Sequence, residues 1–125
     1  MCDAIPFELT NQTALNFPVV PIRDIQQYCD AIARAFAPER IILFGSHACG
    51  RPHEDSDVDV LVVLPHAKRL GRRPSLTIRR RVPAGFPVDI LVKEPRQMRE
   101  RLREGDSFLR EVTEKGRVMY EESHS

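Results

Sequence analysis

The chain has 125 residues, of which 42% are hydrophobic and 30% charged, and its formal net charge is +1. This length and composition predict one soluble globular domain with a buried core, and they exclude a largely disordered chain. A net charge so close to zero also excludes attraction of nucleic acid by the molecule as a whole, so a nucleic-acid partner is possible but not indicated.

The cysteines and the apolar runs indicate where in the cell the protein is expected. Cys2, Cys29 and Cys49 show no C-x-x-C spacing, so we expect no zinc site and take a reducing cytoplasm as the default location. No apolar run approaches membrane-spanning length, and the acidic, polar N-terminus does not look like a signal peptide. We therefore expect no membrane association.

The start of the chain predicts an irregular arm followed by a helix. Residues 1–21 contain three prolines, which interrupt any long element, so we expect an N-terminal arm. Between Ile22 and Ala37, apolar side chains recur at helical spacing, and Pro38 ends the pattern. The residues expected on the buried face of this helix are Ile22, Ile25, Cys29, Ile32 and Phe36.

Two short apolar strands follow, separated by a polar stretch. Residues 41–44 lead directly into Gly45 and Ser46, and residues 47–51 are expected to form a short helical turn. The second strand covers residues 58–64 and is directly preceded by an acidic residue. Both strands consist of β-branched or aliphatic residues, which is typical of strands that are buried on both faces.

Residues 66–85 form a basic segment that contains no Asp or Glu. Its cations are Lys68, Arg69, Arg72, Arg73, Arg79, Arg80 and Arg81. A solvated helix face accounts for this run as well as a patch for triphosphate, RNA or an acidic protein surface does. Pro74 is expected to begin a helix. The segment is long enough for a crossover between parallel strands, although an antiparallel arrangement is also open.

The remaining residues predict one more strand, two helices and a short ending. The third strand covers residues 87–92, and helices are expected over 95–103 and 107–114. Residues 116–120 are β-leaning and are expected either to add an edge strand or to cover the core. Met98 and Leu102 are expected to face inward, and Phe108, Leu109 and Val112 are expected to lie on one side of their helix.

These elements predict one domain over residues 22–121 and a disordered tail over 122–125. The fold class is α/β (α+β), with a short mixed sheet of three to five strands flanked by helices.

The acids at the start of the second strand are the strongest functional signal. Asp57 and Asp59 share one face of the strand, because successive side chains point to opposite faces. Two neighbouring carboxylates on a mostly apolar strand repel each other, and burial disfavours their charged forms. Mg²⁺ binds carboxylate oxygens, so this pair favours a metal site, whereas a purely structural strand has little reason to place two acids there.

Two further features extend this site. The Gly45-Ser46 pair at the end of the first strand suits a phosphate group, because glycine allows close approach of the backbone and free N–H groups attract anions. Asp89 lies in the middle of the third apolar strand and would bring a third carboxylate to the site if that strand lies beside Asp57 and Asp59. Three carboxylates can hold two metal ions about 3.5–4 Å apart.

This pattern resembles the nucleotidyltransferase superfamily of DNA polymerase β. The residues that carry the resemblance are Gly45-Ser46, Asp57-x-Asp59 ten residues later, and Asp89 on a later strand. The small size resembles the minimal nucleotidyltransferase (MNT) branch, and the resemblance covers residues 22–121. One position departs, because the branch often reads Gly-Ser-x-Ala-Arg-Gly and Cys49 stands where that Arg would be. Arg51, two residues on, is the candidate replacement as a phosphate contact.

The resemblance implies a Mg²⁺-dependent transfer of AMP from ATP to a hydroxyl acceptor. Gly45, Ser46 and Arg51 would bind the nucleotide. Asp57 and Asp59 would hold two Mg²⁺ ions, and Asp89 would complete the catalytic one. The acceptor hydroxyl would attack the α-phosphorus and pyrophosphate would leave.

The acceptor is expected to come from a partner, because only about thirty residues follow the third strand. The MNT resemblance implies the antitoxin of a toxin–antitoxin pair. Its partner would be a helical HEPN-domain ribonuclease, which is neutralised by binding and by AMP transfer to a tyrosine. Two alternatives stay open. One is a non-catalytic module that binds a nucleotide or a partner, and the other is a small-molecule nucleotidyltransferase that acts as a homodimer.

Overall fold

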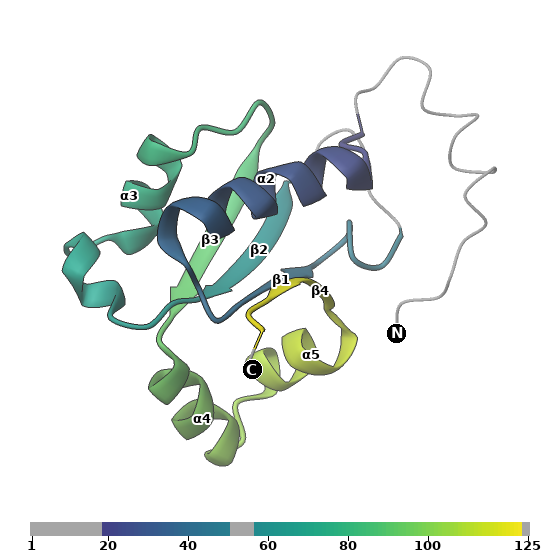
Figure 1. The fold of residues 1–125 in the computed structure, drawn as a ribbon. Helices are drawn as coiled ribbons and strands as arrows, with labels where there is room; N and C mark the ends of the chain where they lie inside the picture. Colours follow the sequence, from purple (N-terminus) through teal and green to yellow (C-terminus); the bar gives the residue numbers. More distant parts are fainter. Residues whose placement is uncertain (1–18, 51–56, 124–125) are drawn as a thin grey trace.

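Four strands form one mixed sheet in the order β3-β2-β1-β4 in the computed structural model, which describes residues 19–50 and 57–123 (Figure 1). The central strands β1 and β2 pair antiparallel, with Ile42 opposite Leu61. The bounds of the strands are β1 Arg40–Phe44, β2 Val58–Val63, β3 Val88–Lys93 and β4 Arg117–Glu121.

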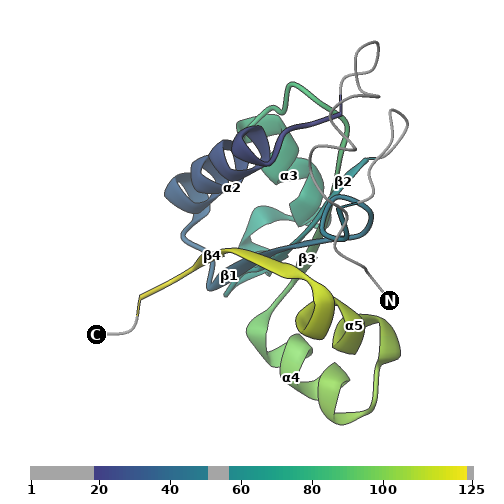
Figure 2. The ribbon, with the colours of Figure 1, turned by 90° about the vertical axis from the view of Figure 1, so that its right-hand side faces the viewer.

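Helices cover both faces of this sheet, as Figure 2 shows, with α2 and α3 on one side and α4 and α5 on the other. A short 3₁₀ helix, η2, lies between β2 and α3. The bounds of the helices are α2 Ile22–Phe36, η2 Ala67–Leu70, α3 Pro74–Arg81, α4 Pro95–Arg103 and α5 Ser107–Lys115. This arrangement confirms the predicted fold class.

The sheet separates two apolar cores because alternate strand residues point to opposite faces. Val58, Val60 and Val62 of β2 face α2 and α3, whereas Leu61 and Val63 face α4 and α5. All five side chains are buried, so β2 is covered on both faces, as its unbroken apolar run predicts.

The parallel pairing of β2 with β3 resolves the connection that the sequence leaves open. The chain leaves β2 and passes through η2 and α3, which places the basic segment in a crossover. Thr77 Oγ1 of α3 donates a hydrogen bond to the Leu70 carbonyl at 2.8 Å and so ties the two helices together. Ile78 anchors α3 in the core and is fully buried.

The face of α2 that packs on the sheet differs at two positions from the prediction. Ile25, Cys29 and Ile32 are buried as expected, but Ile22 is 42% exposed. Tyr28 is buried in addition, and its hydroxyl donates a hydrogen bond to the Val82 carbonyl at 2.8 Å. Tyrosine is tolerated there because its polar end has a partner.

The elements after β3 have well-defined starts. Glu94 and Gln97 form a capping box at the start of α4, and the Asp106 side chain accepts a hydrogen bond from the Leu109 amide at the start of α5. β4 then pairs with β1 and forms one edge of the sheet, which settles the two predicted possibilities in favour of an edge strand. No helix among the described residues is both long and apolar enough to cross a membrane.

Candidate functional site

Two of the predicted carboxylates lie side by side on neighbouring strands. Asp59 of β2 is the register partner of Asp89 of β3, and the two strands are parallel. Paired positions of adjacent strands present their side chains to the same face. Asp57 directly precedes β2, two residues before Asp59, and its carboxylate is close enough to act on the charge of Asp59. The crossover therefore brings together three acids that are up to 32 positions apart in the sequence.

The carboxylates of Asp57 and Asp89 also interact electrostatically with that of Asp59. Asp59 is half-buried, whereas Asp57 and Asp89 are exposed. Burial, followed by repulsion from the Asp89 and Asp57 carboxylates, raises the pKa of Asp59 above its ordinary value of 3.8. An ionised Asp59 is thus destabilised in the free protein, and a cation at this position would relieve the repulsion.

The bend after β1 lies against Asp59. Gly45 has a φ of +78°, and a Cβ added to it would collide with the Asp59 carboxylate. Only glycine meets both demands, because it has no Cβ and adopts positive φ without strain. The Ala48 and Cys49 amides donate hydrogen bonds to the Gly45 carbonyl at 3.1 and 3.2 Å, which closes the turn. Ser46, by contrast, makes no hydrogen bond with any residue that the structure describes.

These residues fit a divalent metal by the chemistry of their donors. Carboxylate oxygens are the ligands that Mg²⁺ prefers, and clustered negative charge attracts it. Within residues 19–50 and 57–123, no three acidic, histidine or cysteine side chains lie close enough to ligate one ion as they stand. Asp57 and Asp89 are exposed, so their side chains are free to turn toward Asp59.

A cavity of about 310 Å³ opens beside the Asp59 carboxylate. One wall comes from the end of β1 and the turn after it, including Phe44, Gly45 and Cys49. The opposite wall comes from α5. The α5 residues that line the cavity are Phe108, Glu111, Val112 and Lys115.

This α5 wall is the part of the site that the sequence does not reveal. Its four residues follow the spacing i, i+3, i+4, i+7, which places them on one helix face, but only the packing of α5 shows what that face meets. Gly116 allows this packing, because a Cβ there would lie 3.0 Å from the Leu43 carbonyl oxygen. Phe108 is expected on one side of the helix with Leu109 and Val112, but it differs from them in burial, because it is 48% exposed at the cavity while they are buried.

The other predicted nucleotide contact is Arg51, which lies outside the described residues. Cys49, which departs from the Gly-Ser-x-Ala-Arg-Gly pattern that the MNT branch often has, lines the cavity.

Comparisons with known proteins bear on the fold and the family of the chain. A crystal structure of a candidate nucleotidyltransferase from Sulfolobus solfataricus has a similar fold, with a TM-score of 0.57 and 18% sequence identity over 94% of this chain and 90% of that chain. A search of curated proteins found no match. The sequence model of the nucleotidyltransferase domain family matches residues 25–120, which include Gly45, Ser46 and all three aspartates. The chain therefore belongs to the nucleotidyltransferase domain family.

Proposed function

We propose that the protein is a Mg²⁺-dependent nucleotidyltransferase that transfers AMP from ATP to a hydroxyl acceptor. Membership of the family supports nucleotidyl transfer in general. The observation that carries the specific proposal is the contact between the Gly45 bend and the Asp59 carboxylate, with Asp89 at the paired position of the next strand. A phosphate-binding bend and a set of metal ligands then lie within reach of one triphosphate.

The bend would bind the phosphate groups of the nucleotide. The Ser46 amide and hydroxyl make no hydrogen bond within the described residues, so both are available as donors. Glycine at position 45 lets an anion come close to the backbone. These groups would hold the triphosphate and orient its α-phosphorus toward an incoming hydroxyl, which raises the rate by positioning alone.

The three carboxylates would hold Mg²⁺. When bound, Mg²⁺ offsets the charge of the triphosphate and lowers the pKa of the acceptor hydroxyl. Asp59 is the central ligand in this proposal, because it is the carboxylate that the bend and the paired strand hold in place. Asp57 and Asp89 would add ligands from either side.

For the acceptor, we propose a tyrosine hydroxyl of a helical HEPN-domain toxin, with this chain as its antitoxin. Support comes from the resemblance of the Gly45-Ser46 and Asp57-x-Asp59 pattern to the MNT branch. The proposal expects a stable complex between the two proteins and transfer of one AMP to the toxin.

The test of nucleotidyl transfer is incubation of the protein with α-labelled ATP, Mg²⁺ and the product of the neighbouring gene. Asp59→Asn is expected to lower the rate of label transfer by about 100-fold or more, as the loss of one preorganised electrostatic group does. Asp24→Asn is the matched control, since Asp24 is in the first turn of α2 and, among the described residues, forms an ion pair only with Arg23 at 3.8 Å. Transfer by Asp59→Asn at the wild-type rate would contradict the proposed mechanism.

The identity of the acceptor is tested separately. Mass spectrometry of the labelled partner is expected to find AMP on a tyrosine, and replacement of that tyrosine by phenylalanine should abolish labelling. Label on a small molecule instead, with no complex between the two proteins, would refute the antitoxin assignment and leave nucleotidyl transfer intact.

A further inference from the structure

The cavity beside Asp59 has two walls of different chemistry. One wall carries the Gly45 bend and the Asp59 carboxylate, which are polar. The other is the α5 wall, where the exposed ring of Phe108 presents apolar surface. A single ligand that fills the cavity therefore needs a polar part and an apolar part. The volume of about 310 Å³ is at the lower end of the range of roughly 300–1,000 Å³ for small-molecule sites.

Two aromatic rings line the cavity, one from each wall. Phe44 of β1 and Phe108 of α5 pack edge to face, with ring centroids 5.6 Å apart and planes at 85°. Phe44 is the register partner of Asp59, so this aromatic pair adjoins the carboxylate. An edge-to-face contact uses only one face of one ring and leaves other ring surface open to a ligand.

The exposure of Phe108 has no structural explanation within α5. Leu109 and Val112 already bury the helix against the sheet, with exposed fractions of 1% and 3%, whereas Phe108 keeps 48% of its surface exposed. The polar residues of the same wall are engaged with each other, since Lys115 Nζ lies 3.5 Å from Glu111 Oε1. The ring of Phe108 is thus the main surface that α5 offers to a ligand.

We propose that this cavity is the nucleoside subsite and that the nucleobase stacks on Phe108. The proposal rests on the proposed function and adds the part of the nucleotide that the aspartates and the bend do not explain. A flat aromatic heterocycle suits an exposed ring, and the bend on the facing wall suits the phosphates that the nucleoside carries. Every nucleobase has a π face, so the stacking itself does not select one base.

The test compares two ligands that differ in the nucleoside. Binding of α,β-methylene-ATP and of inorganic tripolyphosphate, each with Mg²⁺, is measured by calorimetry on the full chain. Phe108→Ala is expected to weaken binding of the ATP analogue by roughly 5- to 150-fold, the effect of losing one base–aromatic stack. Binding of tripolyphosphate, which has no base, should change by less than about twofold. Phe108→Trp should retain the affinity for the analogue, and Phe108→Leu, which is apolar but has no ring, should not.

Ile22→Ala is the matched control, because Ile22 is similarly exposed at 42% but lies at the start of α2, on the opposite face of the sheet. It should leave both affinities unchanged. Equal losses for both ligands in Phe108→Ala, or no loss for either, would overturn the nucleoside subsite.

The outcomes also separate this inference from the proposed function. A wild-type protein that binds tripolyphosphate as tightly as the ATP analogue would overturn the subsite and leave the phosphate and metal site standing. A wild-type protein that binds neither ligand would overturn both. If Phe108→Ala leaves nucleotide affinity unchanged but raises the KM for the protein acceptor, the cavity receives the acceptor's ring, and the nucleoside assignment is wrong.

Discussion

At the scale of single residues, Asp59 stands out because its charge works against folding. Its pKa in the folded protein lies above the ordinary value of 3.8, owing to burial and to repulsion by Asp89 and Asp57. A group whose pKa is raised in the folded protein stabilises the fold at pH values below its ordinary pKa. This stabilisation is lost as the pH rises through the folded-state pKa. At neutral pH the ionised side chain therefore lowers the free energy of unfolding.

We expect Asp59→Asn to be more stable than the wild type at pH 7 in the absence of divalent metal, since asparagine does not ionise. The difference should shrink as the pH falls through the folded-state pKa and below 3.8, because Asp59 is then neutral. Urea unfolding at several pH values measures it. Mg²⁺ should stabilise the wild type by about 1.4 kcal/mol at ten times its Kd, and the variant much less. A wild type that Mg²⁺ leaves unchanged would speak against a metal site here.

Gly45 and Gly50 form a matched pair for testing the close approach to Asp59. Both have positive φ, of 78° and 73°, but a Cβ on Gly50 would meet nothing within 4 Å. Gly50→Ala should therefore lower the free energy of unfolding only by the cost of placing alanine in the left-handed conformation, about 1–2 kcal/mol.

Gly45→Ala has the same backbone cost and must also displace the Asp59 carboxylate. We expect a larger loss of stability by thermal unfolding, and loss of Mg²⁺–nucleotide binding that Gly50→Ala does not share. Equal effects of the two substitutions on stability and binding would mean that Gly45 serves only the turn.

Much of the site could be predicted at this scale. Asp57, Asp59 and Asp89 stand out because acids are costly on apolar strands, and Gly45 stands out because it follows such a strand directly. The exposure of Phe108 at the cavity could not be predicted, because a ring next to Leu109 and near Val112 looks like a core residue at helical spacing. Its exposure depends on how α5 packs against β1, which is a property of the tertiary structure.

At the scale of elements, α5 is the wall of the cavity, so its stability bears on the site. The helix has nine residues, which is too short to be stable in isolation, and its first turn depends on the Asp106 cap. The Leu109 amide lies 3.0 Å from Asp106 Oδ1.

Asp106→Ala is expected to lower the free energy of unfolding by about 0.5–2 kcal/mol, the usual cost of losing such a cap. Asp106→Asn keeps an oxygen acceptor and should retain most of that stability. Urea unfolding measures both. If the alanine variant is as stable as the wild type, the cap contributes nothing to α5.

The elements were predicted more completely than the site, because each has a strong local pattern. The expected helix over 95–103 matches α4, and the strand over 87–92 is shifted by one residue in β3. The 3₁₀ helix η2 was missed, since four residues are too few to show a periodicity. The direction of β3 was undetermined, because local pattern does not specify which strand a segment joins.

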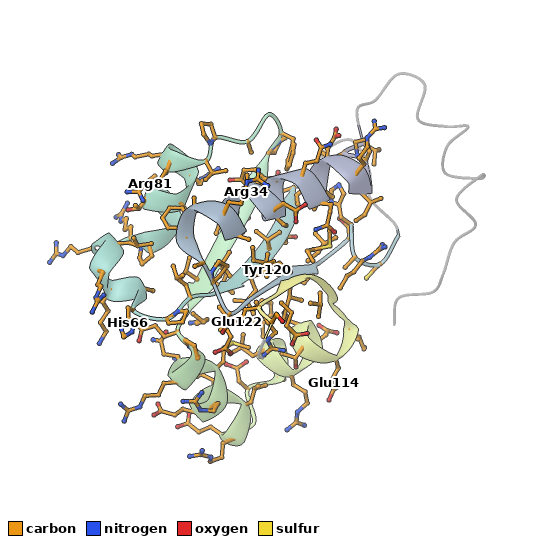
Figure 3. The ribbon with its side chains drawn as sticks, viewed as in Figure 1. Arg34, His66, Arg81, Glu114, Tyr120 and Glu122 are labelled. Carbon is orange, nitrogen blue, oxygen red and sulfur yellow. The ribbon has the colours of Figure 1, made fainter. Side chains whose placement is uncertain are left out.

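At the scale of the whole molecule, the charges are unevenly distributed. Residues 66–85 carry seven basic and no acidic side chains, while the other 105 residues carry twelve basic and eighteen acidic ones, a balance of −6. Figure 3 shows Arg81 on α3 and Glu114 on α5, on opposite sides of the sheet. All seven basic side chains are exposed, and none forms an ion pair within the described residues.

Because these cations repel one another and form no ion pair within the described residues, removing two that have no ring contact there should not destabilise the fold. The double variant Arg79→Gln, Arg80→Gln is expected to be a few tenths of a kcal/mol more stable than the wild type at about 0.01 M salt. The gain should vanish at about 1 M salt, where charges are screened beyond roughly 3 Å.

Arg96→Gln is the control with the opposite sign, because Arg96 pairs with Glu100 at 3.2 Å. Loss of this ion pair should lower the free energy of unfolding by about 0.3–0.5 kcal/mol at low salt. Thermal unfolding across a salt series measures both variants. A double variant that is less stable than the wild type at low salt would show that the basic segment has partners in the fold.

The parallel pairing of β2 with β3 has a consequence for how such a protein can change over time. The register that sets Asp59 beside Asp89 is held by the strands alone, while the chain between them runs outside the ladder. Apart from anchors such as Ile78, this stretch can lengthen, shrink or exchange its charges without shifting the acids by one position. Relatives can therefore diverge in the surface they show to other molecules while the reaction chemistry is inherited intact.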